Sequence, residues 1–271
     1  MEVVVVLTAL YLIECCVWIG ADQYAFTGFR AGAFTIHVGP HVPIAGDRGV
    51  AIAMPLPLSI TVTCDGQARD FDIAALTTRW SAFGESVRLL TPICAIAWFY
   101  VLVLTPAVVI LRGLAGNWES LLIGWVVILA AILFEFRAGF RTLDLEGDCV
   151  SKLVAIALSP FSAVRACDLL ARPVVASFHP VAAAYVLCDR AAFVDAARRF
   201  YFAAPRAPWH ADLKGLLDST RCLEDVLRPP DREGSHLVSF CPRCHGQYAR
   251  AEGDCRDCPS VPLHSFNALP I

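Results

Sequence analysis

Charged side chains are scarce in this 271-residue chain, and lysine is nearly missing. Only 17% of the residues are charged, and Lys152 and Lys214 are the only lysines among 22 basic residues. The formal net charge is −3 and the pI is near 6.1, so the chain has no overall positive charge with which to attract nucleic acid. Apolar residues make up 57% of the sequence, well above the share usual for a globular domain. This surplus must be covered by something, and lipid is the first candidate.

The common catalytic motifs are also missing from the sequence. It contains no glycine-rich phosphate loop, no nucleophile elbow and no His-Glu-x-x-His pattern. Twelve cysteines are present, but eight of them are scattered through mostly apolar surroundings, where a free thiol behaves as a small hydrophobic side chain. Such scattering favours a reducing compartment over a disulfide scaffold. The sequence thus gives enzymatic activity no positive signal and favours a non-enzymatic protein.

Two long apolar stretches predict a transmembrane helical hairpin over residues 89–137. Leu89–Leu111 contains no charged residue, and as a helix it is long enough to cross a hydrocarbon core of about 30 Å. Trp118–Phe136 follows after a short break and is apolar between Ser120 and Phe134. The alternative is a hairpin that lies buried in a soluble core.

The N-terminal residues 1–20 are a third candidate for a membrane helix. Val3–Ile19 is apolar and has about the minimum length for a span, but Glu14 lies inside it. An acidic side chain within the membrane costs a few kcal/mol, on the order of 3 for Asp at the centre of a helix. The alternative for this segment is a buried strand and helix. A functional acid is a further possibility, in which Glu14 and Glu135 serve a transporter or a membrane enzyme.

The distribution of basic residues predicts the orientation of the hairpin. Residues 21–88 and 138–271 are separated by two crossings, so both lie on the same side of the membrane. The hairpin loop holds one basic residue, Arg112. Basic residues flank the hairpin on its other side, namely Arg79, Arg88, Arg137, Arg141 and Lys152. The positive-inside rule therefore places 21–88 and 138–271 in the cytoplasm of a multi-pass cell-membrane protein.

Residues 21–88 have the pattern of a small β module. From Val50 to Val62 every second residue is large and apolar, which is typical of a half-buried strand. Asp65 and Gly66 form a two-residue turn signal, after which Phe71 and Ile73 would continue a returning strand. The segment Phe34–Val38 alternates in the same way.

Residues 138–228 return to a helical period and predict a helical cytoplasmic segment. Prolines at 160 and 180 are placed as the first residues of helices. Helices are expected over Pro160–Ala171, 190–202 and Trp209–Leu227, and Val174–Leu187 is expected to be an interfacial or packed helix. A linker at 229–235 leads to the last part of the chain, residues 236–271.

Four cysteines near the end of the chain have the spacing of metal ligands. Cys241, Cys244, Cys255 and Cys258 form a C-x2-C-x10-C-x2-C pattern. Two Cys-x-x-Cys turns brought together make a tetrahedral cage of four sulfurs, which Zn²⁺ prefers. Four thiolates leave no open coordination position, so the predicted zinc is structural. The alternatives are two redox disulfides or an iron site of the rubredoxin type.

This segment resembles the zinc-ribbon knuckles found at the ends of many bacterial proteins. The resemblance covers residues 239–266 and rests on CPRC, Tyr248, CRDC and Pro262-Leu263. It implies that the four cysteines are the zinc ligands, but it implies no task, because such modules contact nucleic acids, bind proteins or are purely structural. The chain departs from the pattern at His245 and Pro259, where glycine is common, and this predicts strained turns.

The sequence as a whole predicts a mixed membrane protein with a transmembrane hairpin, a β module, a helical segment and a zinc ribbon. The first hypothesis for its function is a scaffold or adaptor in the membrane that docks a protein partner. The second is a membrane-tethered regulator or subunit whose ribbon contacts nucleic acid through Arg243, Arg250 and Arg256. The transporter or membrane-enzyme component is the third.

Overall fold

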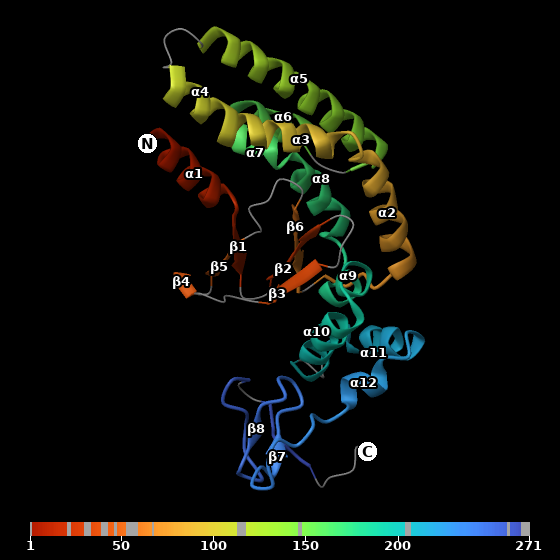
Figure 1. Cartoon of the computed structure of the whole chain (residues 1–271). Helices are drawn as coiled ribbons and strands as arrows, with labels where there is room; N and C mark the ends of the chain where they lie inside the picture. Colours follow the sequence, from red (N-terminus) through yellow and green to blue (C-terminus); the bar gives the residue numbers. More distant parts are fainter. Residues whose placement is uncertain are drawn as a thin grey trace. The chain divides into compact units, whose positions relative to one another are not determined.

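The computed structural model of the chain is mostly helical and consists of two compact units, Met1–Leu187 and Cys188–Ile271. Figure 1 shows their helices and strands. The structure describes residues 2–20, 23–29, 34–38, 43–45, 48–52, 59–66, 68–112, 118–145, 148–203, 207–258 and 261–266.

The N-terminal segment is a helix followed by a strand, so the predicted membrane helix over 1–20 is corrected. Helix α1 spans Glu2–Glu14, and strand β1 follows at Cys16–Gly20. β1 is held by antiparallel pairing with β5 (Arg48–Ile52) along its whole length. The structure thus has the helix and the strand of the alternative, but the helix is not buried, because most of its described side chains are exposed.

The β module contains two three-stranded antiparallel sheets. The first has the order β1-β5-β4, with β4 at Pro43–Ala45. The second has the order β3-β2-β6, with β2 at Gln23–Phe29 and β6 at Ser59–Asp65. The predicted strand Phe34–Val38 is confirmed as β3. In the second sheet, Phe26 lies opposite both Ile36 and Val62.

The strand predicted over Val50–Val62 is wrong as a single element. Its two ends belong to β5 and β6, which lie in different sheets, and the prolines at 55 and 57 fall outside the described residues. The alternation still reports the buried face, because Ile60 and Val62 are fully buried in β6. Thr61 between them is buried as well, so β6 is covered on both faces.

The predicted return strand through Phe71 and Ile73 is also wrong, because helix α2 (Ile73–Ser86) begins there. Asp72 is its N-cap, and the carboxylate accepts a hydrogen bond of 2.9 Å from the backbone N–H of Ala75. A second carboxylate, that of Asp70, accepts from the N–H of Asp72 at 2.9 Å. These two local bonds start a helix and outweigh the strand pattern.

The predicted hairpin is present as two apolar helices. The first runs through α3 (Leu90–Phe99), the π-helical segment η1 (Tyr100–Leu104) and α4 (Thr105–Arg112), and the second is α5 (Trp118–Thr142). Their apolar lengths are 22 residues for Leu90–Leu111 and 25 for α5, enough to cross a membrane. In α5 the buried residues lie in the second half, from Ile132 to Phe140.

Four further helices complete the first unit: α6 (Cys149–Leu158), α7 (Pro160–Val164), α8 (Ala166–Val175) and α9 (Pro180–Leu187). The helix predicted over Pro160–Ala171 is divided, because Arg165 leaves the helical conformation between α7 and α8. α8 packs against β6, α2, α3 and α5, and it therefore joins the β module to the hairpin. α9 is packed rather than interfacial, since most of its side chains are buried.

The second unit consists of three helices and the cysteine-containing segment. α10 (Arg190–Ala203) confirms the helix predicted over 190–202. The helix predicted over Trp209–Leu227 is instead two helices, α11 (His210–Ser219) and α12 (Leu223–Leu227). The chain turns between them at Arg221, whose φ of 55° lies in the left-handed region.

Candidate metal centre and exposed apolar surface

Three two-residue strands position the four cysteines. β7 (Ser239–Phe240) pairs antiparallel with both β8 (Gln247–Tyr248) and β9 (His264–Ser265). Cys241 and Cys244 lie on the turn between β7 and β8, and Cys255 and Cys258 lie on the loop between β8 and β9. The small sheet thus brings together the two Cys-x-x-Cys turns.

The four Sγ atoms form one cluster. They all lie within 4.8 Å of one another, and the Sγ atoms of Cys244 and Cys255 are 3.6 Å apart. With metal–sulfur bonds of about 2.3 Å, a regular tetrahedron places its sulfurs about 3.8 Å apart. None of the four forms a disulfide, and they make one group of four rather than two separate pairs. The arrangement therefore fits a single metal ion held by four thiolates.

Backbone hydrogen bonds fix each turn. In the first, the N–H of His245 donates to the carbonyl of Cys241 at 2.9 Å, and the N–H of Cys241 donates to Gly246 at 2.8 Å. In the second, the N–H of Val261 donates to Cys258 at 3.2 Å, and the N–H of Cys255 donates to Val261 at 2.9 Å. In both turns the N–H of the first cysteine donates to a carbonyl beyond the second cysteine, which closes the turn.

The strain expected at the first turn is present. His245 has a φ of 61°, a left-handed conformation that glycine adopts without cost and other residues do not. Pro259, the other departure from the knuckle pattern, lies outside the described residues.

Replacing His245 by glycine is expected to stabilise the second unit by about 1 kcal/mol, because the left-handed strain is relieved. The gain is smaller than the full strain, since the imidazole also packs edge-on against Phe240 with ring centroids 6.3 Å apart. Thermal unfolding of the metal-loaded protein measures this change. His245→Ala keeps the strain and loses the ring, so it serves as the control and is expected to destabilise.

Burial and hydrogen bonds give the thiols different acidities. Burial raises the pKa of Cys241 to about 11 and also raises that of Cys258. Burial acts in the same direction on Cys255, but the Tyr248 hydroxyl, 3.1 Å from its Sγ, and further bonds from neighbouring groups bring its pKa down to about 7. The thiol of Cys255 in turn raises the pKa of Tyr248 to about 12. Of these three thiols, Cys255 is therefore the most readily deprotonated.

The cysteines are themselves most of the core around them. Cys241, Cys255 and Cys258 are buried with Val261, and Tyr248 and Leu263 pack against this group. Cys244 is exposed. So small a core offsets little of the conformational entropy of the segment, and a bound metal ion would add the stability that it lacks.

The other residues singled out in the sequence do not come together in a site. Glu14 is exposed at the end of α1, and Glu135 is half-buried on α5. Of the arginines near the knuckles, Arg256 is exposed, whereas Arg250 folds back over the Tyr248 ring and donates to the carbonyl of Asp254 at 2.5 Å.

A buried ion pair was missed in the sequence. The Asp168 carboxylate accepts hydrogen bonds from the Arg165 guanidinium, one of them at 2.7 Å from Nε, and another at 3.1 Å from the backbone N–H of Thr61. Burial lowers the pKa of Arg165, but the neighbouring Asp168 more than compensates and raises it above its ordinary value. The available signal was an arginine and an aspartate three residues apart within an otherwise apolar helix.

Exposed apolar side chains gather on four segments of the first unit. Nearly all the exposed large ones belong to α1, the helix through 89–111, α5 and α6. Leu111 is 81% exposed, Leu158 80% and Phe134 73%. In the described part of 188–271, by contrast, no large apolar side chain is exposed. Exposed apolar side chains in such number are typical of a membrane or protein contact.

Comparison with protein-family models, curated protein sequences and solved structures gives no match for this chain. The function is therefore argued from the cysteine cluster and the apolar surface.

Proposed function

We propose that this chain is a multi-pass membrane scaffold or adaptor, with a structural zinc ribbon in the cytoplasm that docks a protein partner. The observation that carries the proposal is the division of surface between the two units. Apolar side chains are exposed on the helices of the first unit, while the second unit holds a four-cysteine cluster and a polar surface.

The low burial of the apolar side chains of the hairpin supports a membrane location. In the most apolar 18-residue stretch of each helix, only 22% of the residues of Leu90–Leu111 and 11% of those of α5 are buried within the protein. A core hairpin of a soluble protein would bury most of these residues. α6 presents the same kind of surface, with Val150, Val154 and Leu158 exposed, so the proposed lipid contact extends beyond the two spans.

Packing on either side of the hairpin supports the proposed topology. The backbone N–H of His179 donates to the carbonyl of Asp70 at 2.8 Å, and the Thr61 N–H donates to Asp168. Segments before and after the hairpin thus share one core, as two crossings require. The four-cysteine cluster supports a reducing compartment, because thiolates that bind zinc must remain unoxidised.

A reporter fused after Ile271 is expected to behave as cytoplasmic, and one inserted at Ala115 as external, because the positive-inside rule places Arg112 alone on the far side. Alkaline phosphatase and green fluorescent protein fusions measure the two positions. Alkaline carbonate extraction is the control for membrane integration. Release of the protein by carbonate, or activity of both reporters on one side, contradicts the proposal.

The scaffold role is tested through the ribbon. Cross-linking in cells is expected to capture the same protein partner with the wild type and with Cys188→Ser, and to lose it with Cys241→Ser. Cys188 lies outside the cluster and is a free thiol, so it is a matched control. Equal capture by all three proteins contradicts a role for the ribbon in docking.

Contact with nucleic acid is the second candidate, favoured by the exposed Arg256 beside the second turn. This candidate is weaker than the scaffold, because Arg250 packs over Tyr248 and one of the three arginines is thus engaged within the ribbon. Binding of the full chain to single- or double-stranded DNA or RNA at low salt, lost as salt rises, supports this candidate. Absence of binding at low salt removes it.

A further inference from the structure

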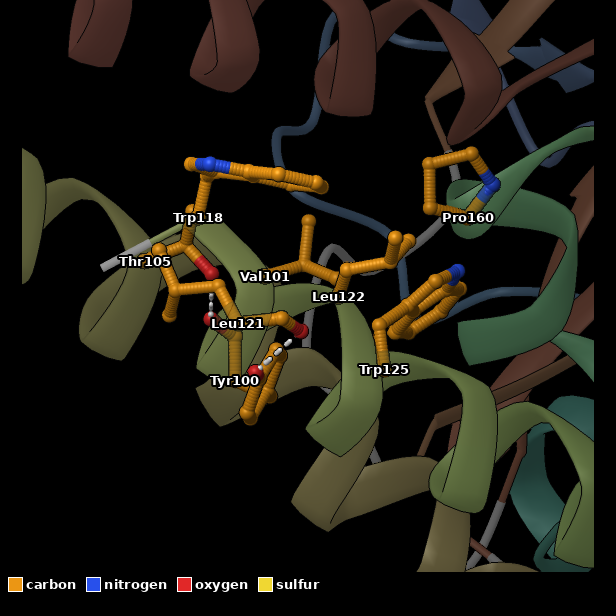
Figure 2. Close-up of a pocket in the computed structure, with 8 residues that line it drawn as sticks. All are labelled: Tyr100, Val101, Thr105, Trp118, Leu121, Leu122, Trp125 and Pro160. Carbon is orange, nitrogen blue, oxygen red and sulfur yellow. Dashed lines mark hydrogen bonds between the residues drawn. The ribbon is translucent and has the colours of Figure 1, made fainter. Parts of the chain in front are cut away.

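A pocket lies between the two hairpin helices and α7. Its volume is about 390 Å³, within the range of small-molecule sites. It is lined by residues of η1, α4, α5 and α7, which are Tyr100, Val101, Thr105, Trp118, Leu121, Leu122, Trp125 and Pro160. Figure 2 shows Trp118, Trp125 and Pro160 around the side chains of Val101 and Leu122.

The π-helical segment η1 shapes one wall. Within η1, the carbonyl of Tyr100 accepts both the backbone N–H of Thr105 and its hydroxyl, the latter at 2.8 Å. The Tyr100 hydroxyl donates across the hairpin to the carbonyl of Leu121 at 2.5 Å, and Gly124 leaves room for its ring. Helical irregularities of this kind are frequent at functional sites.

The chemistry of the lining selects a hydrocarbon. The surface of the pocket is almost wholly apolar. Its two hydroxyl groups already donate to backbone carbonyls, Tyr100 to Leu121 and Thr105 to Tyr100. A polar ligand would lose its hydration without gaining these donors, and this costs free energy. An apolar chain meets no such penalty.

The location of the pocket's opening indicates where that hydrocarbon comes from. Two of its lining residues, Trp118 and Leu122, are about half exposed and belong to the apolar surface of α5. The pocket is therefore continuous with the surface proposed to face lipid. It is too small for a helix of another chain, whose diameter is about 10 Å. Trp118 is the first residue of α5, beside the hairpin loop, and Trp125 lies about 10 Å deeper along the helix axis.

We propose that this pocket binds one acyl chain of a membrane phospholipid. The inference rests on the proposed membrane location. It assigns the protein a specific lipid-binding site in addition to its general contact with the bilayer. In this site the acyl chain lies between Trp118 and Trp125, with Pro160 across from them.

Native mass spectrometry of the full chain, extracted in a mild detergent and then delipidated, tests the site. The probe is phosphatidylcholine with a dibrominated stearoyl chain, supplied in mixed micelles. The wild type is expected to retain one brominated phospholipid. Leu122→Trp and Leu121→Phe fill the pocket from two positions and are expected to retain about tenfold less, as follows from excluding two methylene groups.

Ile123→Trp is the matched control, because Ile123 is 65% exposed on the same helix and does not line the pocket. It is expected to retain lipid as the wild type does. Equal retention by the control and both filling variants overturns the site, and so does a wild type that retains no phospholipid or retains an isoprenoid instead. Carbonate extraction of the same preparations separates this failure from failure of the membrane location itself.

Discussion

Removal of the proposed zinc ion is expected to unfold the ribbon, residues 236–266, while the first unit stays folded. In comparable peptides, structural zinc contributes on the order of 10–16 kcal/mol, and the metal-free segments are unfolded. Here three of the four cysteines, together with Val261, are themselves the buried core. Without the metal, folding would bury neutral thiols beside one another. The few apolar contacts around them would not offset the conformational entropy lost when the segment is ordered.

Hydrogen exchange on the purified protein measures this effect. The N–H groups of Cys241 and Leu263, each bonded at 2.8 Å to Gly246 and Gly253 respectively, are expected to lose protection after chelation. Metal analysis is expected to find one equivalent of zinc in the wild type and in Cys188→Ser, and none in Cys241→Ser. Persistent protection after chelation contradicts a structural role for the metal. If the analysis finds one equivalent of iron instead of zinc, the site is of the rubredoxin type.

Breaking the buried ion pair is expected to cause the second large loss of stability. Asp168→Ala is expected to destabilise the first unit by about 3–5 kcal/mol, because it leaves the Arg165 guanidinium buried without its counter-charge. The side chains of Arg165 and Asp168 are only 12% and 3% exposed. The same substitution also removes the acceptor of the Thr61 N–H in β6, which adds to the loss.

Thermal unfolding in detergent compares this variant with two others. Arg190→Ala breaks the exposed pair with Asp225 and is expected to leave the transition unchanged, since solvent screens that pair. The double variant Arg165→Met with Asp168→Leu removes both charges and is expected to recover much of the stability. If Asp168→Ala unfolds at the wild-type temperature, or the double variant is worse than the single one, charge pairing is not what holds this site.

Local patterns predicted those parts of the molecule that depend on local chemistry. The spacing of Cys241, Cys244, Cys255 and Cys258 was enough to place four thiols together, because each turn is fixed by bonds within a few residues. Long apolar runs likewise predicted both hairpin helices. The unusual φ at His245 followed from its place in the knuckle pattern.

The errors arose where distant partners or helix caps decide the structure. The alternation from Val50 to Val62 is the same in one strand or two, and only the pairing of β5 with β1 and of β6 with β2 divides it. Asp72 starts α2 through a bond that the strand pattern around Phe71 ignores. The spacing of Arg165 and Asp168 allows an ion pair, but its burial depends on β6, where the N–H of Thr61, 107 residues away, donates to Asp168.

The partnership of β6 with α8 governs when the first unit can finish folding during synthesis. The ribosome releases β6 early, yet its cover arrives only after both hairpin helices have been made, since Thr61 bonds to Asp168 and Asp70 to His179. A nascent chain halted after α5 therefore carries a sheet with one side bare. Such stalled products are natural substrates for chaperones and quality-control proteases.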